Sequence, residues 1–438
     1  MINKAQSFVV FKGRLRINKS ILGKGGVFLV ANILNAMIPF LLLPILTRVL
    51  TPSDYGVVAM FAIFLAFTNT LVGLSVHGAI NVQYFKMDTV RFSQYLTGCL
   101  LLLISSEIFV FLLVLLFGAY FEDLIGIPYK WMLIGVITSF FQFLITIRLA
   151  TWVVLGNAFH YGVFQVSNTS LNTIISLALI FMLGLTWTGR LLGQVIAIVI
   201  FGVIAFVLLT KQGLVKKAIY WKIDMVDALK FGIPLIPHTI GAFVIYNVDR
   251  AILSNTLGVA SVGIYMVAIQ LGQVMGLVVE SYNKVYSPWL MKELTNTDVN
   301  KEKIVMYSYF SMFIIVGFGV IWSIVARFLL PIVAGREFQE ASSLIFYTSM
   351  GFSLTGLYYL VTNYIFYAKK TKLLAMITFF CALINIPLAY MFIHFYGLKG
   401  AGIGFVLIQL LFFLMTWMLA AKVHPMPWLY FLKGKENA

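Results

Sequence analysis

The stretch that decides the fold is VFLVANILNAMIPFLLLPILTRVLTPSDYG, residues 27–56. About 20 mostly apolar residues precede its first charge, Arg48, which is enough for a helix to cross the hydrocarbon core of a bilayer. The TPSDYG that follows is a turn sequence and ends the helix. Pro39 and Pro44 lie inside the apolar run and remove backbone donors, so neighbouring helices must help to satisfy the backbone. We therefore expect this helix to pack inside a larger bundle.

The composition of the whole chain indicates that lipid is its main solvent. Of 438 residues, 61% are hydrophobic and 11% are charged, and the mean hydropathy is +0.98. Such a chain has too little polar surface for a soluble globular protein. Its two cysteines, Cys99 and Cys381, both lie in apolar runs and are not spaced like a disulfide framework. The chain is therefore expected to be an all-α, polytopic membrane protein.

Apolar runs of span length predict twelve transmembrane helices in two lobes of six. The predicted spans are 27–47, 57–79, 95–118, 131–154, 164–185, 189–210, 231–254, 259–279, 304–330, 341–362, 372–393 and 399–422. The predicted units are a basic segment 1–26, an N-lobe 27–210, a linker 211–230, a C-lobe 231–422 and a tail 423–438. The lysines among apolar residues in 211–230 predict an amphipathic helix at the membrane interface, and 280–303 resembles it.

Two internal similarities support a chain built from equivalent halves. Residues 50–57 (LTPSDYGV) and 257–264 (LGVASVGI) share their first leucine, a glycine at the seventh position and an aliphatic residue at the eighth. A second set recurs at one constant spacing: Leu177, Ala178, Phe181, Gly189 and Gly193 match Leu388, Ala389, Phe392, Gly400 and Gly404. Because each half has an even number of spans, the halves are expected to share one orientation in the membrane.

The basic residues predict that both termini are cytoplasmic. Of the 31 Lys and Arg residues, 24 fall in the N-terminal segment and in connections on the same side, and seven fall on the other side. This bias follows the positive-inside rule. It also accounts for most of the net charge of +16, so no nucleic acid partner is expected.

Four motifs together resemble the Wzx-type polysaccharide flippases, which share a superfamily with multidrug exporters and the peptidoglycan lipid flippase. They are N..N...P....P.LTR.LTPSDYG at 32–56, DR at 249–250, GIY at 263–265 and GLKGAGIG at 397–404. The resemblance implies a two-lobed, MATE-like transporter in the bacterial inner membrane. Its cargo would be an undecaprenyl-pyrophosphate-linked oligosaccharide for O-antigen, capsule or exopolysaccharide. The implied partners are the bilayer, this lipid-linked oligosaccharide, and a polysaccharide polymerase with its chain-length machinery.

An anionic, sugar-bearing head group would need cations and hydrogen-bonding groups along its path. The candidate substrate-binding residues are Arg48, Arg148, Asp249, Arg250, Arg327 and Tyr358. Alternatives remain open for each of the stronger candidates. Asp249 and Arg250 also fit an ion pair at the interface, and Arg48 fits an arginine that extends outward to water.

Glu107 is the carboxylate nearest to mid-membrane, within the apolar run of the third span. A bare carboxylate there would cost a few kcal/mol, so it should face the bundle interior, be paired or be protonated. Proton coupling and structural pairing are both open.

Polar stripes on the spans also have two interpretations, since such stripes either hold helices together or line a transport path. These stripes comprise Gln165, Asn168, Asn172 and Ser176; Gln270, Gln273 and Glu280; and Tyr347, Gly351, Thr355, Tyr358 and Thr362.

The sequence argues against two other classes of function. A membrane polymerase or glycosyltransferase normally needs a sizeable loop for catalytic carboxylates, whereas the outer connections here are short and carry no DxD, HExxH or Walker-type pattern. A cation-coupled drug exporter needs acidic residues in its cavity, and the first span has none. We therefore predict a flippase, with the exporter as the alternative, and expect no enzymatic activity, cofactor or metal.

Overall fold

The computed structural model describes residues 19–296 and 299–428, and all regular secondary structure in this part is helical. The first half contains α1 (Lys19–Val49), α2 (Pro52–Gly73), α3 (Val76–Tyr84), α4 (Thr89–Phe117), η1 (Gly118–Phe121), α5 (Glu122–Ile125), α6 (Tyr129–Val154), α7 (Ala158–Leu183) and α8 (Trp187–Lys211). The second half contains α9 (Trp221–Gly232), η2 (Ile233–Leu235), α10 (Ile236–Leu257), α11 (Val259–Thr295), α12 (Lys301–Val333), η3 (Arg336–Ser343), α13 (Ile345–Tyr367) and α14 (Thr371–Val423).

These helices provide the twelve predicted spans. In the described part of the chain, ten helices are individually long and apolar enough to cross a membrane. The bent pair of η3 and α13 adds an eleventh. The 53-residue α14 is two spans joined at Gly397, where φ is 58° and the helix breaks. A positive φ favours glycine, which carries no Cβ to clash with the backbone.

The turn after the first span shows how local sequence sets a helix boundary. Thr51 lies just before α2, and its hydroxyl accepts a hydrogen bond from the backbone N–H of Asp54 at 3.1 Å. The Asp54 carboxylate in turn accepts from the backbone N–H of Thr51 at 3.1 Å. Pro52 occupies the first helical position, where its missing N–H has no partner to lose. The TPSD sequence therefore ends one span and begins the next.

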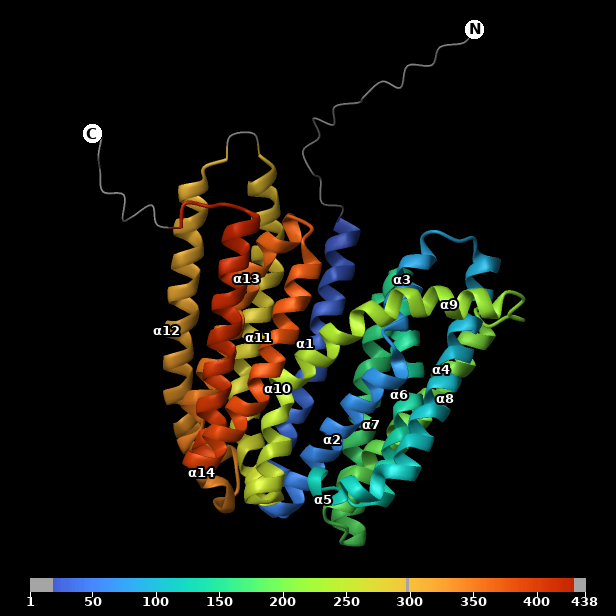
Figure 1. The fold of residues 1–438 in the computed structure, drawn as a ribbon. Coiled ribbons are helices and arrows are strands. Elements are labelled where there is room, and N and C mark those ends of the chain that lie inside the picture. The colour runs from blue at the N-terminus through green and yellow to red at the C-terminus, as the bar shows by residue number, and fades with distance from the viewer. Residues whose placement is uncertain (1–18, 297–298, 429–438) are drawn as a thin grey trace.

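The spans form two lobes that converge at one end and separate toward the other (Figure 1). The N-lobe comprises α1 to α8, and the C-lobe comprises α10 to α14. We call the end where α1 begins and α14 finishes the terminal end, and the opposite end the closed end. α2 of the N-lobe packs against α11 and α10 of the C-lobe.

The polar residues of the first span pack it inside the N-lobe, as expected. Asn32 accepts a hydrogen bond from the hydroxyl of Tyr161 at 3.3 Å, and Asn35 accepts one from the hydroxyl of Thr169. Both donors lie on α7. Side-chain hydrogen bonds between helices are a common adhesive within membranes.

The two predicted interfacial helices are placed differently by the structure. Residues 212–220 of the linker are not helical, and the helix in this region is α9, which starts at Trp221 and leads into α10. Residues 280–303 do not form a separate helix: α11 continues to Thr295, and α12 begins at Lys301. The helix α9 overlaps the second half of the predicted linker segment, so this helix is shifted along the chain. The prediction for 280–303 is wrong, because lysines among apolar residues also suit the ends of long spans that emerge from the bilayer.

The linker helix α9 is attached to the N-lobe. It lies across α3 and α4 at the terminal end (Figure 1). Asp224 is 1% exposed and pairs with both terminal nitrogens of Arg91 on α4. Asp227 accepts hydrogen bonds from Tyr95 and Gln83, each at 2.9 Å. These contacts make α9 part of the N-lobe, so a movement between lobes has to bend the chain after it.

Candidate functional site

The closed end is formed by two glycines from the internal repeat. Gly56 on α2 and Gly263 on α11 are the seventh residues of the paired segments 50–57 and 257–264. A Cβ at Gly56 would lie 2.0 Å from the carbonyl oxygen of Val259, and a Cβ at Gly263 would lie 2.0 Å from that of Pro52. The equivalent helix starts of the two lobes therefore cross in backbone contact, which requires glycine at both positions.

A second contact between the lobes involves Arg48 at the end of α1. Its guanidinium donates to the carbonyl of Ile332 on α12 at 2.7 Å and to that of Pro44 at 2.6 Å. Beside it, the backbone N–H of Gly335 donates to the hydroxyl of Thr47 at 3.1 Å. Arg48 therefore links the end of α1 to the end of α12 in this conformation, by capping the carbonyl of Ile332.

Asp249 and Arg250 form a buried ion pair at the same end of the C-lobe. Both side chains are less than 8% exposed, and the guanidinium donates to the carboxylate at 2.9 Å. The hydroxyl of Tyr265 on α11 donates to the second carboxylate oxygen at 2.6 Å. The Arg250 guanidinium also lies over the Tyr265 ring, 5.5 Å from its centroid. The pair is thus held inside the lobe, although the Nε of Arg250 has no partner among the described residues.

Substitution of Arg250 separates a structural from a transport role. We expect Arg250→Ala to destabilise the protein by about 3–5 kcal/mol, because it leaves a buried carboxylate without its counterion. Arg250→Lys keeps the charge but loses the planar fork of donors. If Arg250 only supports the lobe, the unfolding temperature in detergent and the transport rate will decrease together in the two variants. If Arg250→Lys is stable but no longer transports, the guanidinium instead binds the cargo directly.

Arg190 at the start of α8 is a further cation. It is not among the substrate-binding residues predicted from the sequence. Its guanidinium donates to the side chains of Asn172 and Ser176 on α7, the latter at 2.8 Å. Its Nε has no partner in the part of the chain that the structure describes. Nearby, the hydroxyl of Tyr55 on α2 donates to Gln270 on α11 at 2.8 Å and joins the two lobes. The sequence feature that could have pointed to this region is the spacing of Asn172 and Ser176, the two partners of Arg190. They lie one helical turn apart on the predicted polar stripe.

The polar stripe on α7 lines a cavity inside the N-lobe. This amide cavity has a volume of about 240 Å³ and lies between α1, α6, α7 and α8. Its lining includes six carboxamides: Asn35, Gln142, Gln165, Asn168, Asn172 and Gln194. The side-chain oxygens of Gln165 and Asn168 are buried and have no hydrogen-bond partner in the structure. The stripe therefore lines a space as well as joining helices.

A groove of about 620 Å³ separates the lobes between α1 and α11. α1 contributes Asn32 and apolar residues to it, and α11 contributes apolar residues together with Glu280 and Lys284. These two side chains form an ion pair at 2.9 Å and are about half exposed. The groove therefore combines polar and apolar walls where the lobes separate.

The remaining predicted residues lie apart from these features. Arg148 is fully buried within the N-lobe, with its guanidinium 4.0 Å from the centroid of the Trp152 ring. Arg327 lies on the exposed face of α12. Tyr358 stacks on Phe412 inside the C-lobe, with the ring centroids 4.4 Å apart.

Glu107 lies in an apolar groove between α4 and α6 on the N-lobe. One oxygen of its carboxylate is buried and has no hydrogen-bond partner within residues 19–296 and 299–428. In the described part of the chain no basic side chain lines this groove, so pairing with a cation, one of the alternatives for Glu107, is not seen there. Proton coupling through Glu107 stays a prediction.

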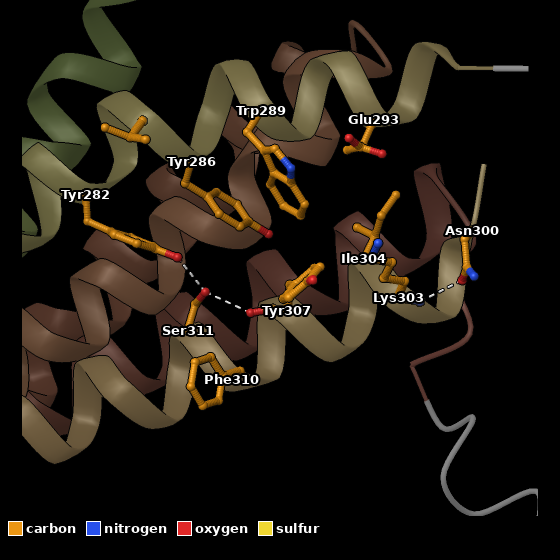
Figure 2. Close-up of a pocket in the computed structure, with 11 residues that line it drawn as sticks. Tyr282, Tyr286, Trp289, Glu293, Asn300, Lys303, Ile304, Tyr307, Phe310 and Ser311 are labelled. Carbon is orange, nitrogen blue, oxygen red and sulfur yellow. Dashed lines mark hydrogen bonds between the residues drawn. The ribbon is translucent and has the colours of Figure 1, made fainter. Parts of the chain in front are cut away.

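A separate aromatic groove of about 580 Å³ lies between the end of α11 and the start of α12 (Figure 2). Tyr282, Tyr286 and Trp289 project into it from α11, and Tyr307 faces them from α12. The hydroxyls of Tyr282 and Ser311 share a hydrogen bond at 2.6 Å. Tyrosine and tryptophan gather where helices pass the lipid head groups. The groove therefore has the aromatic composition that is typical of a membrane interface.

Comparison with known proteins identifies relatives over most of the chain. Residues 21–293 match a family described as polysaccharide biosynthesis protein. An uncharacterized membrane protein of Haemophilus influenzae is 24% identical over 378 residues, covering 84% of this chain and 88% of the relative. Another protein of that organism, described as Lsg locus putative protein 1, is 23% identical over 354 residues, covering 80% and 85%.

Solved structures share the fold at low sequence identity. The lipid II flippase MurJ in an inward closed conformation has a TM-score of 0.72 at 15% identity, with 90% of this chain and 87% of MurJ covered. An inward-facing multidrug resistance MATE transporter of the MOP superfamily has a TM-score of 0.65 at 14% identity, covering 92% and 96%. The predicted MATE-like fold is confirmed.

Proposed function

The chain belongs to the polysaccharide biosynthesis protein family, and we propose that it is a flippase for a polyprenyl-pyrophosphate-linked oligosaccharide. It would move this cargo from the cytoplasmic to the outer leaflet of the bacterial inner membrane by alternating access. A polymerase would then consume the product to build O-antigen, capsule or exopolysaccharide.

The groove between α1 and α11 carries this proposal. It lies where the two lobes separate, and its walls are partly polar and partly apolar. A charged and hydrated head group faces a very large barrier in hydrocarbon, whereas a polyprenyl tail is stable there. A lateral groove allows the head to enter between the lobes while the tail stays in lipid. The protein then has to shelter only the head group.

The orientation in the membrane supports the direction of transport. Among the described residues, lysines and arginines are concentrated at the terminal end, and such residues favour the cytoplasmic side. With that orientation, this conformation is closed toward the outside and open toward the cytoplasm, where lipid-linked repeat units are made.

The alternative of a cation-coupled drug exporter keeps support from the likeness to MATE transporters. Such exporters need free acidic groups in the cavity. Here Asp249 is paired with Arg250, and Glu280 is paired with Lys284. The amide cavity has no acidic residue in its lining. This balance favours an anionic or neutral head group over a cationic drug.

A deletion strain tests the function. We expect complete lipid-linked glycan to accumulate in the cytoplasmic leaflet and surface polysaccharide to be lost, with both restored by the wild-type gene. The leaflet is identified from the access of a lectin to the glycan in right-side-out and inverted vesicles. Intact surface glycan combined with higher sensitivity to cationic drugs would establish the exporter and exclude the flippase.

A further inference from the structure

The amide cavity inside the N-lobe has a chemistry of its own. Building on the proposed flippase function, we infer that it binds one neutral sugar ring of the cargo head group. The cavity lies between four helices of one lobe, and most of its polar lining consists of carboxamides. Its ligand can therefore be deduced from the groups that face it.

Carboxamides match the hydroxyl groups of a sugar. Each carboxamide both donates and accepts hydrogen bonds, and each hydroxyl does the same. In the structure the buried oxygens of Gln165 and Asn168 have no partner. A buried polar atom without a partner costs free energy, so these oxygens need a ligand or ordered water. A ring bearing several hydroxyls would satisfy them together.

The charge and the hydrogen-bonding groups around the cavity disfavour cations, apolar chains and pyrophosphate as ligands. No carboxylate lines it, and the Arg190 guanidinium donates to Asn172 in its wall. A cation would therefore be repelled. An apolar chain would leave the carboxamides unpaired. A pyrophosphate would have to compete for Arg190 with two side chains that it already binds. A neutral polyol satisfies the lining without these conflicts.

The size of the cavity limits the ligand to a single ring. A volume of about 240 Å³ equals roughly eight water molecules at about 30 Å³ each. Sites for drug-sized ligands start at about 300 Å³. The cavity is therefore large enough for one hydrated monosaccharide ring and too small for a complete oligosaccharide.

The first span connects this cavity to the groove between the lobes. Asn35 lines the amide cavity, while Asn32 and Ala36 on neighbouring positions of the same helix line the groove. In the described chain α1 contacts mainly α7. A head group entering along the groove would thus meet α1 first and could place its leading ring beside α7.

Substitution of Asn168 and Gln165 tests the sugar site. We expect Asn168→Leu and Gln165→Leu each to weaken binding of the natural lipid-linked glycan by about tenfold to one-hundredfold, because the hydrogen bonds to the ring are lost. Binding of polyprenyl pyrophosphate without sugar should be unchanged. Both ligands are measured on purified full-length protein by native mass spectrometry. Thr173→Val is the matched control on α7, because that hydroxyl bonds only to its own helix, at Thr169.

The outcome depends on how each substitution changes the affinity for the lipid-linked glycan relative to the affinity for polyprenyl pyrophosphate. A lower affinity for the glycan alone, in folded protein that elutes as a single species, supports the sugar site. Equal losses for both ligands, or no loss for either, would overturn it. The proposed function fails separately, if the wild-type protein binds and transports neither lipid-linked ligand.

Discussion

Gly263→Val is expected to reduce transport by about one-hundredfold. Even the Cβ of an alanine would lie 2.0 Å from the carbonyl oxygen of Pro52 and 3.0 Å from the backbone nitrogen of Gly56. Both neighbours are backbone atoms, so neither can move aside as a side chain could. Overpacking of this kind costs about 1–3 kcal/mol, and the upper value shifts a two-state equilibrium by about one-hundredfold. The closed end would be forced apart, and the cycle would lose this conformation.

Gly317→Val on α12 is the matched control. Gly317 also lies inside a long helix, and a Cβ there would meet no atom within 4 Å. The two substitutions therefore make the same change in helix propensity and differ in packing. Transport is measured in reconstituted vesicles, and opening of the closed end is measured by maleimide labelling of Ser254→Cys, a buried position. Unchanged transport and labelling in Gly263→Val would show that the glycine crossing does not matter.

Asp224→Ala is expected to lower the free energy of unfolding by about 2 kcal/mol and to slow transport. The carboxylate is 1% exposed and binds Arg91 through two donors. The loss is smaller than the 3–5 kcal/mol typical of a fully buried pair, because the Arg91 side chain is 27% exposed and can turn toward water. Without the pair α9 would loosen from α4, and movement of one lobe would be transmitted poorly to the other.

Two further variants interpret that result. The double variant Arg91→Asp, Asp224→Arg exchanges the two charges of the pair. It should recover part of the stability that Asp224→Ala loses, as measured by thermal unfolding in detergent. Glu280→Gln breaks the half-exposed pair with Lys284 and should change stability by less than about 0.5 kcal/mol. If Asp224→Ala is as mild as Glu280→Gln, α9 is not held to the N-lobe by this pair.

The sequence alone determined the number of spans and their division into two lobes. Each span is a local run of apolar residues whose length must match the bilayer, so no knowledge of its neighbours was needed. The helix boundary in TPSDYG was predicted for the same reason, since the capping residues act within one helical turn, although the structure places all of this segment after Thr51 in α2. The repeated glycines Gly56 and Gly263 were visible as a pattern, but their contact was not.

Only the tertiary structure decided what each polar residue touches. Arg48 and Arg190 both read as cations near the outer ends of spans, yet Arg48 binds α12 in the other lobe and Arg190 borders the amide cavity. Arg148 read as a residue at a span end and is fully buried. The reason is physical: hydropathy depends on a residue and its neighbours in sequence, whereas burial and pairing depend on helices that approach from hundreds of residues away.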